Sequence, residues 1–86
     1  MLIAIDYDGT YTLDKIFWND FIVMSRKSGH EIICPTMRYQ SEPILDMDCK
    51  IIYTGRKAKA AYLLGLGIVP NIWIDDSPNL LYFDAV

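Results

Sequence analysis

The stretch Leu2-Ile3-Ala4-Ile5-Asp6-Tyr7-Asp8-Gly9-Thr10 decides the fold. A short apolar run that ends on acidic residues and a glycine is typical of a buried strand of about 4–6 residues in a parallel sheet. Two carboxylates at the end of one strand repel each other, which indicates that a cation or a reaction uses them. The alternative is a simple Asp-Gly turn after the strand.

Length and composition predict one small α/β domain. The chain has 86 residues, of which 52% are hydrophobic, and a net charge of −3. The sequence has no stripe of basic residues of the kind that would indicate nucleic-acid binding. No apolar run approaches the ~18 residues of a membrane span, and the first run lacks the basic residues of a signal peptide. We therefore expect a cytoplasmic protein with no membrane partner, in which Cys34 and Cys49 are free thiols.

Strand and helix signals alternate along the chain. Asp14 is a candidate N-cap for the first helix, whose apolar residues Phe17, Phe21 and Met24 share one face. The expected strands are 2–5, 31–36, 50–54 and 71–76, and the expected helices are 15–28, 56–66 and a short one from 77. Residues 43–47 are expected to hold one or two helical turns. Alternation of this kind predicts a parallel sheet of about four strands, in the order 4-1-2-3, flanked by helices.

Polar side chains follow every expected strand. In a parallel sheet the carboxyl ends of the strands meet at one edge, and ligands bind beyond that edge. The residues in these positions are Asp6, Asp8, Thr36, Thr54, Asp75 and Asp76. A site at this edge explains such a concentration of polar groups better than solvation does.

Four of these segments resemble, in order, the motifs of the haloacid dehalogenase-like (HAD) superfamily. Asp6-Tyr7-Asp8-Gly9-Thr10 resembles its DxDGT motif, and Thr36 resembles the Thr or Ser that ends its second motif. Lys57 stands where the lysine of the third motif is expected, although Lys59 is an alternative. Trp73-Ile74-Asp75-Asp76-Ser77 is similar to the acidic fourth motif. The resemblance implies a Rossmann-like HAD core over residues 1–86 and a phosphatase activity.

The resemblance also implies roles for the two aspartates of the first motif. Asp6 would be the nucleophile that forms an aspartyl-phosphate, which divides one difficult step into two. Asp8 would be the general acid for the leaving group and the base for the attacking water. That role requires a pKa raised toward neutrality, which neighbouring negative charge favours.

Clustered carboxylates at a phosphate site call for a hard divalent cation, and oxygen ligands favour Mg²⁺ over zinc. By resemblance, its ligands are Asp6, the backbone carbonyl of Asp8 and one of Asp75 and Asp76. We favour Asp76 as the direct ligand and Asp75 as its supporting partner. The pair could instead form a helix N-cap, which accounts for one carboxylate but not for both.

The remaining expected site residues act on the phosphate. Thr36 would donate its hydroxyl to a phosphoryl oxygen, or else make a local turn bond. Lys57 would neutralise charge between the nucleophile and the phosphate. Thr10 is expected to bind substrate. Arg38 either reaches the substrate phosphate or pairs with an acid.

The chain departs from the HAD pattern in several ways. The connections after the first and second strands are too short for a cap domain, so a capless member is expected. The resemblance then implies either a bulky phosphorylated substrate or a partner subunit that closes the site. A missing fifth strand would leave a sheet edge that a homodimer could cover. Tyr11 replaces a small aliphatic residue and is expected to narrow the mouth of the site. Other functions that fit are a non-catalytic binding or regulatory domain, a phospho-acceptor, and a phosphotransferase.

Overall fold

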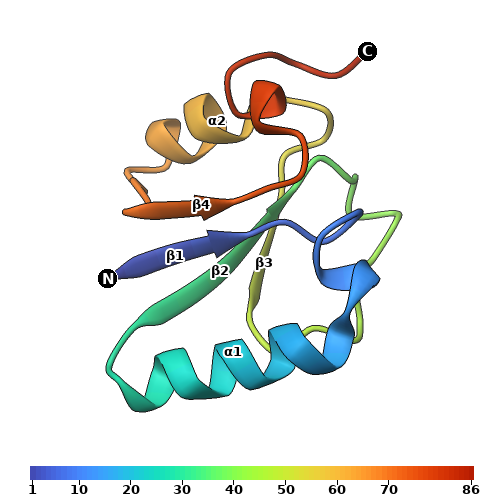
Figure 1. Cartoon of the computed structure of the whole chain (residues 1–86). Coiled ribbons are helices and arrows are strands. Elements are labelled where there is room, and N and C mark those ends of the chain that lie inside the picture. The colour runs from blue at the N-terminus through green and yellow to red at the C-terminus, as the bar shows by residue number, and fades with distance from the viewer.

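The computed structural model describes residues 1–86 and has four strands, two α-helices and two short 3₁₀ helices (Figure 1). In chain order these are β1 (Leu2–Ile5), η1 (Tyr11–Leu13), α1 (Lys15–Lys27), β2 (Glu31–Thr36), β3 (Lys50–Tyr53), α2 (Lys59–Gly65), β4 (Ile72–Ile74) and η2 (Pro78–Leu81). The alternating α/β pattern predicted from the sequence is confirmed.

The four strands form one sheet in which every neighbouring pair is parallel. Their order is β3-β2-β1-β4, which is the expected order 4-1-2-3 counted from the opposite edge. β1 lies in the interior, paired with β2 on one side and with β4 on the other. The carboxyl ends of β1 and β4 therefore lie side by side.

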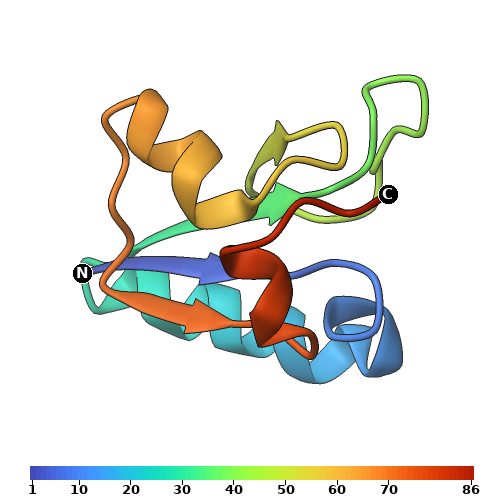
Figure 2. The ribbon, with the colours of Figure 1, turned by 90° about the horizontal axis from the view of Figure 1, so that it is seen from above.

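The sheet has a helix layer on each face, as the two views of the ribbon show (Figures 1 and 2). Side chains alternate along each strand, so neighbouring residues enter different layers. Ile3 and Ile5 of β1 pack with Ile22 of α1 in one buried cluster. Ala4, between them, packs with Leu63 of α2 in the other. The short apolar run of β1 is therefore buried from both sides.

Helix α1 begins where the sequence predicts. The Asp14 side chain accepts a hydrogen bond from the backbone N–H of Phe17, 3.1 Å away, and so caps the helix. Of the three apolar residues expected on one face, Phe17 and Met24 are 56% and 67% exposed, whereas the neighbouring Ile22 is buried. Trp18 and Phe21 lie against the core at its margin.

Helix α2 begins at Lys59, three residues later than expected. Gly55 and Arg56 both have positive φ angles, of 59° and 70°, which are incompatible with a right-handed helix. The backbone N–H of Ala58 then donates to Asp84 Oδ1 at 2.6 Å instead of entering a helical turn. The loop after β3 therefore includes residues 54–58.

No helix forms at residues 43–47, contrary to expectation. The segment is held by side chains instead. Ile44 and Met47 are buried in the core on the α1 face. The Ile44 N–H donates to the Tyr53 hydroxyl at 3.0 Å, and Asp46 accepts hydrogen bonds from Tyr7 and Lys15 at 2.7 and 2.6 Å. These nonlocal contacts fix the loop without regular structure.

Tyr11 does not narrow the mouth of the site, because its side chain is fully buried in the core. Its ring stacks on Tyr7 with the centroids 5.6 Å apart. Its hydroxyl lies 2.7 Å from Asn19 Oδ1 and 2.9 Å from the carbonyl oxygen of Asp46. Tyr11 thus connects the turn after β1 with α1 and with the long loop after β2.

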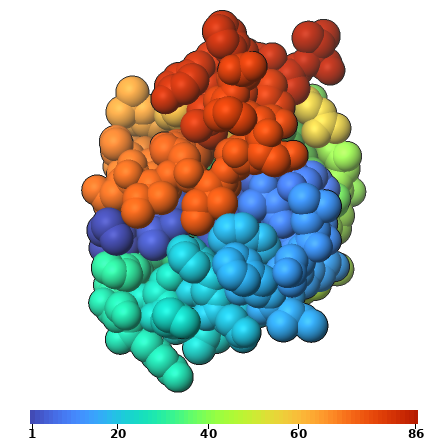
Figure 3. All heavy atoms as spheres, in the orientation of Figure 1, coloured from blue at the N-terminus to red at the C-terminus, as the bar shows by residue number.

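The C-terminal residues 78–86 lie over the same side of the molecule as α2, where Figure 3 shows them in red. The N–H of Ala85 donates to the carbonyl of Arg56 at 2.8 Å, so this segment holds the loop before α2. None of the helices has the length and apolar character that crossing a membrane requires. Cys34 is buried in the core and, like Cys49, forms no disulfide.

Replacing Tyr11 with phenylalanine should lower the free energy of unfolding by about 1–2 kcal/mol, because the hydroxyl of this buried side chain no longer bonds Asn19 and the carbonyl of Asp46. Urea denaturation followed by circular dichroism measures this. Tyr82→Phe is the matched control, since Tyr82 is 72% exposed and should tolerate the change. Equal effects of the two substitutions would show that the buried hydroxyl contributes nothing.

Candidate active site

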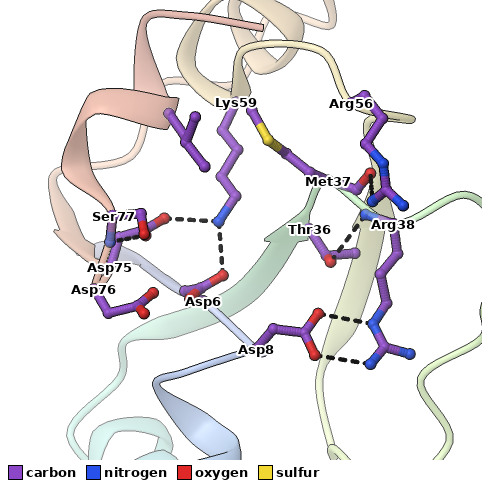
Figure 4. Close-up of a pocket in the computed structure, with 11 residues that line it drawn as sticks. Asp6, Asp8, Thr36, Met37, Arg38, Arg56, Lys59, Asp75, Asp76 and Ser77 are labelled. Carbon is purple, nitrogen blue, oxygen red and sulfur yellow. Dashed lines mark hydrogen bonds and ion pairs between the residues drawn. The ribbon is translucent and has the colours of Figure 1, made fainter. Parts of the chain in front are cut away.

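A polar pocket of about 210 Å³ lies beyond the carboxyl ends of the strands (Figure 4). Met37 and Leu80 are its apolar lining residues. Its other lining residues are Asp6, Asp8, Thr36, Arg38, Arg56, Lys59, Asp75, Asp76 and Ser77. Most of the expected site residues are therefore brought together, whereas Thr10, Thr54 and Lys57 lie outside this pocket.

Asp6 lies at the floor of the pocket, directly after β1, with its side chain buried. Its backbone N–H donates to the carbonyl of Ile74 at 2.9 Å, which extends the pairing of β1 with β4. Oδ1 accepts a hydrogen bond from Lys59 at 2.7 Å, and Oδ2 accepts one from the Thr10 hydroxyl at 3.1 Å. Burial raises the pKa of Asp6 above its usual value, and Lys59 acts in the opposite direction.

The lysine of the site is Lys59, not Lys57. The Lys59 ammonium is buried and donates to Asp6 Oδ1 and to Asp75 Oδ2, both at 2.7 Å. Burial lowers its pKa, but the two carboxylates outweigh burial and the pKa is raised. The Lys57 side chain is 67% exposed and lies 3.9 Å from Asp84. Of the two lysines considered from the sequence, the structure therefore selects Lys59, because the loop extends through Ala58 and Lys59 is the first residue of α2.

Asp75 and Asp76 have different surroundings. Asp75 accepts hydrogen bonds on both oxygens, from Lys59 at 2.7 Å and from the N–H of Ser77 at 2.9 Å. Asp76 is exposed, and its carboxylate lies so close to Gly9 that a Cβ at that position would collide with it. One carboxylate oxygen from each of Asp6, Asp75 and Asp76 lies within 4.8 Å of the others. This oxygen set suits a hard cation, with Asp76 the most accessible of the three.

Asp8 is held by Arg38. The guanidinium donates from Nε and Nη2 to the two carboxylate oxygens, both at 2.8 Å (Figure 4). It also lies over the Tyr7 ring. These hydrogen bonds lower the pKa of Asp8 below its usual value. The expected rise toward neutrality is therefore wrong for this arrangement. Arg38 was expected either to reach the substrate phosphate or to pair with an acid, and in the structure it pairs with Asp8.

The three threonines considered from the sequence have separate roles. Thr36 lines the pocket, and its hydroxyl oxygen accepts from the N–H of Arg38 at 3.2 Å, which leaves its proton free to donate. Thr10, expected to bind substrate, instead donates to Asp6. The Thr54 hydroxyl donates to the carbonyl of Lys57 at 2.8 Å and stabilises the loop before α2.

Arg56 is a pocket residue that the sequence analysis did not identify. Its guanidinium donates to the carbonyl of Met37 at 3.0 Å and to Glu42 at 3.3 Å, and lies over the Tyr39 ring. The sequence signal that could have identified Arg56 is its position directly after Gly55, at the end of a strand. No pattern in the sequence indicated that the arginine itself has a left-handed backbone.

No family model, no curated protein and no solved structure matches the chain.

Replacing Lys59 with methionine should destabilise the fold by about 3–5 kcal/mol above neutral pH, because two buried carboxylates lose their counter-ion. Lys57→Met is the matched control and should change stability little, since that ion pair is exposed. Urea denaturation without divalent cations compares the two. Similar losses for both variants would contradict the assignment of Lys59 to the buried site.

Proposed function

We propose that the chain is a Mg²⁺-dependent phosphatase of the HAD-like type, which hydrolyses phosphomonoesters through an aspartyl-phosphate on Asp6. The observation that carries this proposal is a buried aspartate at a strand end, hydrogen-bonded by Lys59 and Thr10 and open to a pocket with further acidic groups. These hydrogen bonds hold one carboxylate in a fixed orientation, as a nucleophile requires.

In the first step an oxygen of Asp6 attacks phosphorus, and the bond from phosphorus to the ester oxygen breaks. Asp8 gives its proton to the departing oxygen, so the product is a neutral alcohol. In the second step water attacks the phosphorus of the aspartyl-phosphate and gives a proton to Asp8. Inorganic phosphate leaves and the Asp6 carboxylate is restored. Thr36 donates its hydroxyl proton to a phosphoryl oxygen throughout.

Asp6, Asp76 and the backbone carbonyl of Asp8 would hold the Mg²⁺ ion. Asp75 already accepts a hydrogen bond on each oxygen, so its part is to position Lys59. The bound cation neutralises the negative charge that would otherwise repel the substrate phosphate. Three carboxylates around a single ammonium leave the negative charge that such a cation requires.

Asp8 must leave Arg38 before it can exchange a proton. A phosphate group is an alternative partner for a guanidinium, because it too accepts two parallel hydrogen bonds. Substrate binding would therefore draw Arg38 from Asp8 and release the carboxyl for catalysis. Arg38 then binds substrate and also controls when Asp8 becomes available.

The same Arg38–Asp8 pair supports a second candidate function. If Asp8 remained paired, Asp6 could accept a phosphoryl group but would lose it slowly, as in a phospho-acceptor domain. The lifetime of the phosphorylated protein separates the two functions, since a phosphatase loses the group within its turnover time.

Replacing Asp8 with asparagine should lower kcat for an aryl phosphate by about 10²–10⁴-fold, because asparagine cannot accept the proton of the water that attacks the aspartyl-phosphate. The release of phenolate from p-nitrophenyl phosphate, with and without Mg²⁺, measures this. Asp48→Asn is the matched control, since Asp48 pairs with Arg26 outside the pocket. Turnover that persists without Mg²⁺, or in Asp6→Asn protein, would contradict the proposed mechanism.

Replacing Gly9 with alanine should abolish the increase in melting temperature that Mg²⁺ produces, because the new Cβ displaces the Asp76 carboxylate. Gly29→Ala is a matched control. Gly29 has a similar φ, +85° against +81°, but no atom lies within 4 Å of its added Cβ.

Both glycine variants should be destabilised by about 1–2 kcal/mol from backbone strain. Only Gly9→Ala should also lose the response to Mg²⁺ in a thermal melt. A response that survives in this variant would remove Asp76 from the metal site.

A further inference from the structure

Arg56 is the only residue other than glycine with a positive φ, at 70°. This conformation is unfavourable for a side chain with a Cβ. Neighbouring backbone groups hold it: the Arg56 N–H donates to Met37, its carbonyl accepts from Ala85, and the N–H of Gly55 donates to Arg38, at 2.8, 2.8 and 3.2 Å. Strained residues held in this way concentrate at functional sites.

The Arg56 guanidinium is fixed but incompletely neutralised. Its contacts with Glu42 are long, at 3.3 and 3.4 Å, and both side chains are partly exposed to solvent. One further hydrogen bond goes to the carbonyl of Met37. An arginine has five N–H donors, so this pocket-lining residue has donors that these contacts do not use.

Arg38 supplies a second guanidinium on the same wall. In Figure 4 both arginines lie across the pocket from Lys59, Asp75 and Asp76. Arg38 also donates to the carbonyl of Glu42 at 3.3 Å, so the two guanidiniums share a neighbour. The pocket thus has a wall of acidic residues around one lysine and, facing it, a wall of two arginines.

The size and lining of the pocket limit how it can recognise a substrate. Its volume of about 210 Å³ is below the roughly 300–1,000 Å³ of pockets that enclose a whole drug-sized ligand. Apolar lining comes from Met37 and Leu80 alone. Recognition beyond the scissile phosphate therefore depends on charge, and the groups available for it are cationic.

We propose that Arg38 and Arg56 bind a second phosphate group of the substrate, next to the scissile one. The substrate class is then a phosphate ester that carries two neighbouring phosphates. This inference rests on the proposed function, because it assumes that the scissile phosphate lies at Asp6. Arg56 determines specificity in this arrangement and takes no part in bond breaking.

Calorimetric titration of inorganic phosphate and inorganic diphosphate into the protein, with saturating Mg²⁺ in both solutions, tests the inference. The wild-type protein should bind diphosphate at least about tenfold more tightly than phosphate, since the second group gains charge-assisted hydrogen bonds. Arg56→Gln should remove this preference. Arg26→Gln is the matched control, because Arg26 pairs with Asp48 outside the pocket, and it should leave the preference intact.

A second variant separates a loss of the binding site from a loss of folding in Arg56→Gln. Glu42→Gln keeps an oxygen for the N–H of Tyr39 but removes the carboxylate that competes for Arg56. It should tighten diphosphate binding, which a merely damaged protein cannot do. Equal binding of the two anions, or a preference unchanged in both variants, would overturn the inference.

The result is independent of the phosphatase assay. Turnover of an aryl phosphate without any preference for diphosphate would overturn the second phosphate site and leave the proposed function standing. A preference for diphosphate that depends on Arg56, in a protein without turnover, would support the site and count against the phosphatase.

Discussion

The buried ammonium of Lys59 is the contact on which the rest of the site depends. Lys59 belongs to α2, and its Nζ donates to Asp6 Oδ1 at the end of β1 and to Asp75 Oδ2 at the end of β4, both at 2.7 Å. Burying charge is unfavourable unless the groups are paired and hydrogen-bonded. Lys59 meets this condition for two carboxylates at once, so the helix, the two strand ends and the Asp6 side chain hold one another in place.

The same contact explains how charge is distributed over the pocket. The acidic wall has more carboxylates than Lys59 can neutralise, and the surplus lies at Asp76, the most exposed of the three. Gly9 lets that carboxylate approach the turn after β1, where any Cβ would collide with it. The two arginines come from other loops, after β2 and β3, and pair with Asp8 and Glu42, so they do not neutralise the acidic wall.

The sequence predicts the parts of this molecule that local signals control. The apolar run of β1, the Asp14 cap and the polar residues at strand ends all lie as their chemistry indicates. The choice between Lys57 and Lys59 depended instead on where α2 begins. That start depends on a left-handed Arg56 and a hydrogen bond from Ala58 to the distant Asp84, which local propensity does not report. The prediction of helical turns at residues 43–47 was wrong for the same reason, because tertiary contacts hold this segment as a loop.

The pairing of Asp8 with Arg38 is the least predictable feature and the most informative. Thirty residues separate the two in sequence, and the arginine lowers the pKa of a carboxyl that the proposed catalysis needs raised. A guanidinium that binds one planar oxyanion through two hydrogen bonds can exchange it for another at small cost. A phosphate arriving at Arg38 offers such an exchange. Asp8 would then be released only when a substrate is present, so recognition of the substrate and readiness for proton transfer would be one event.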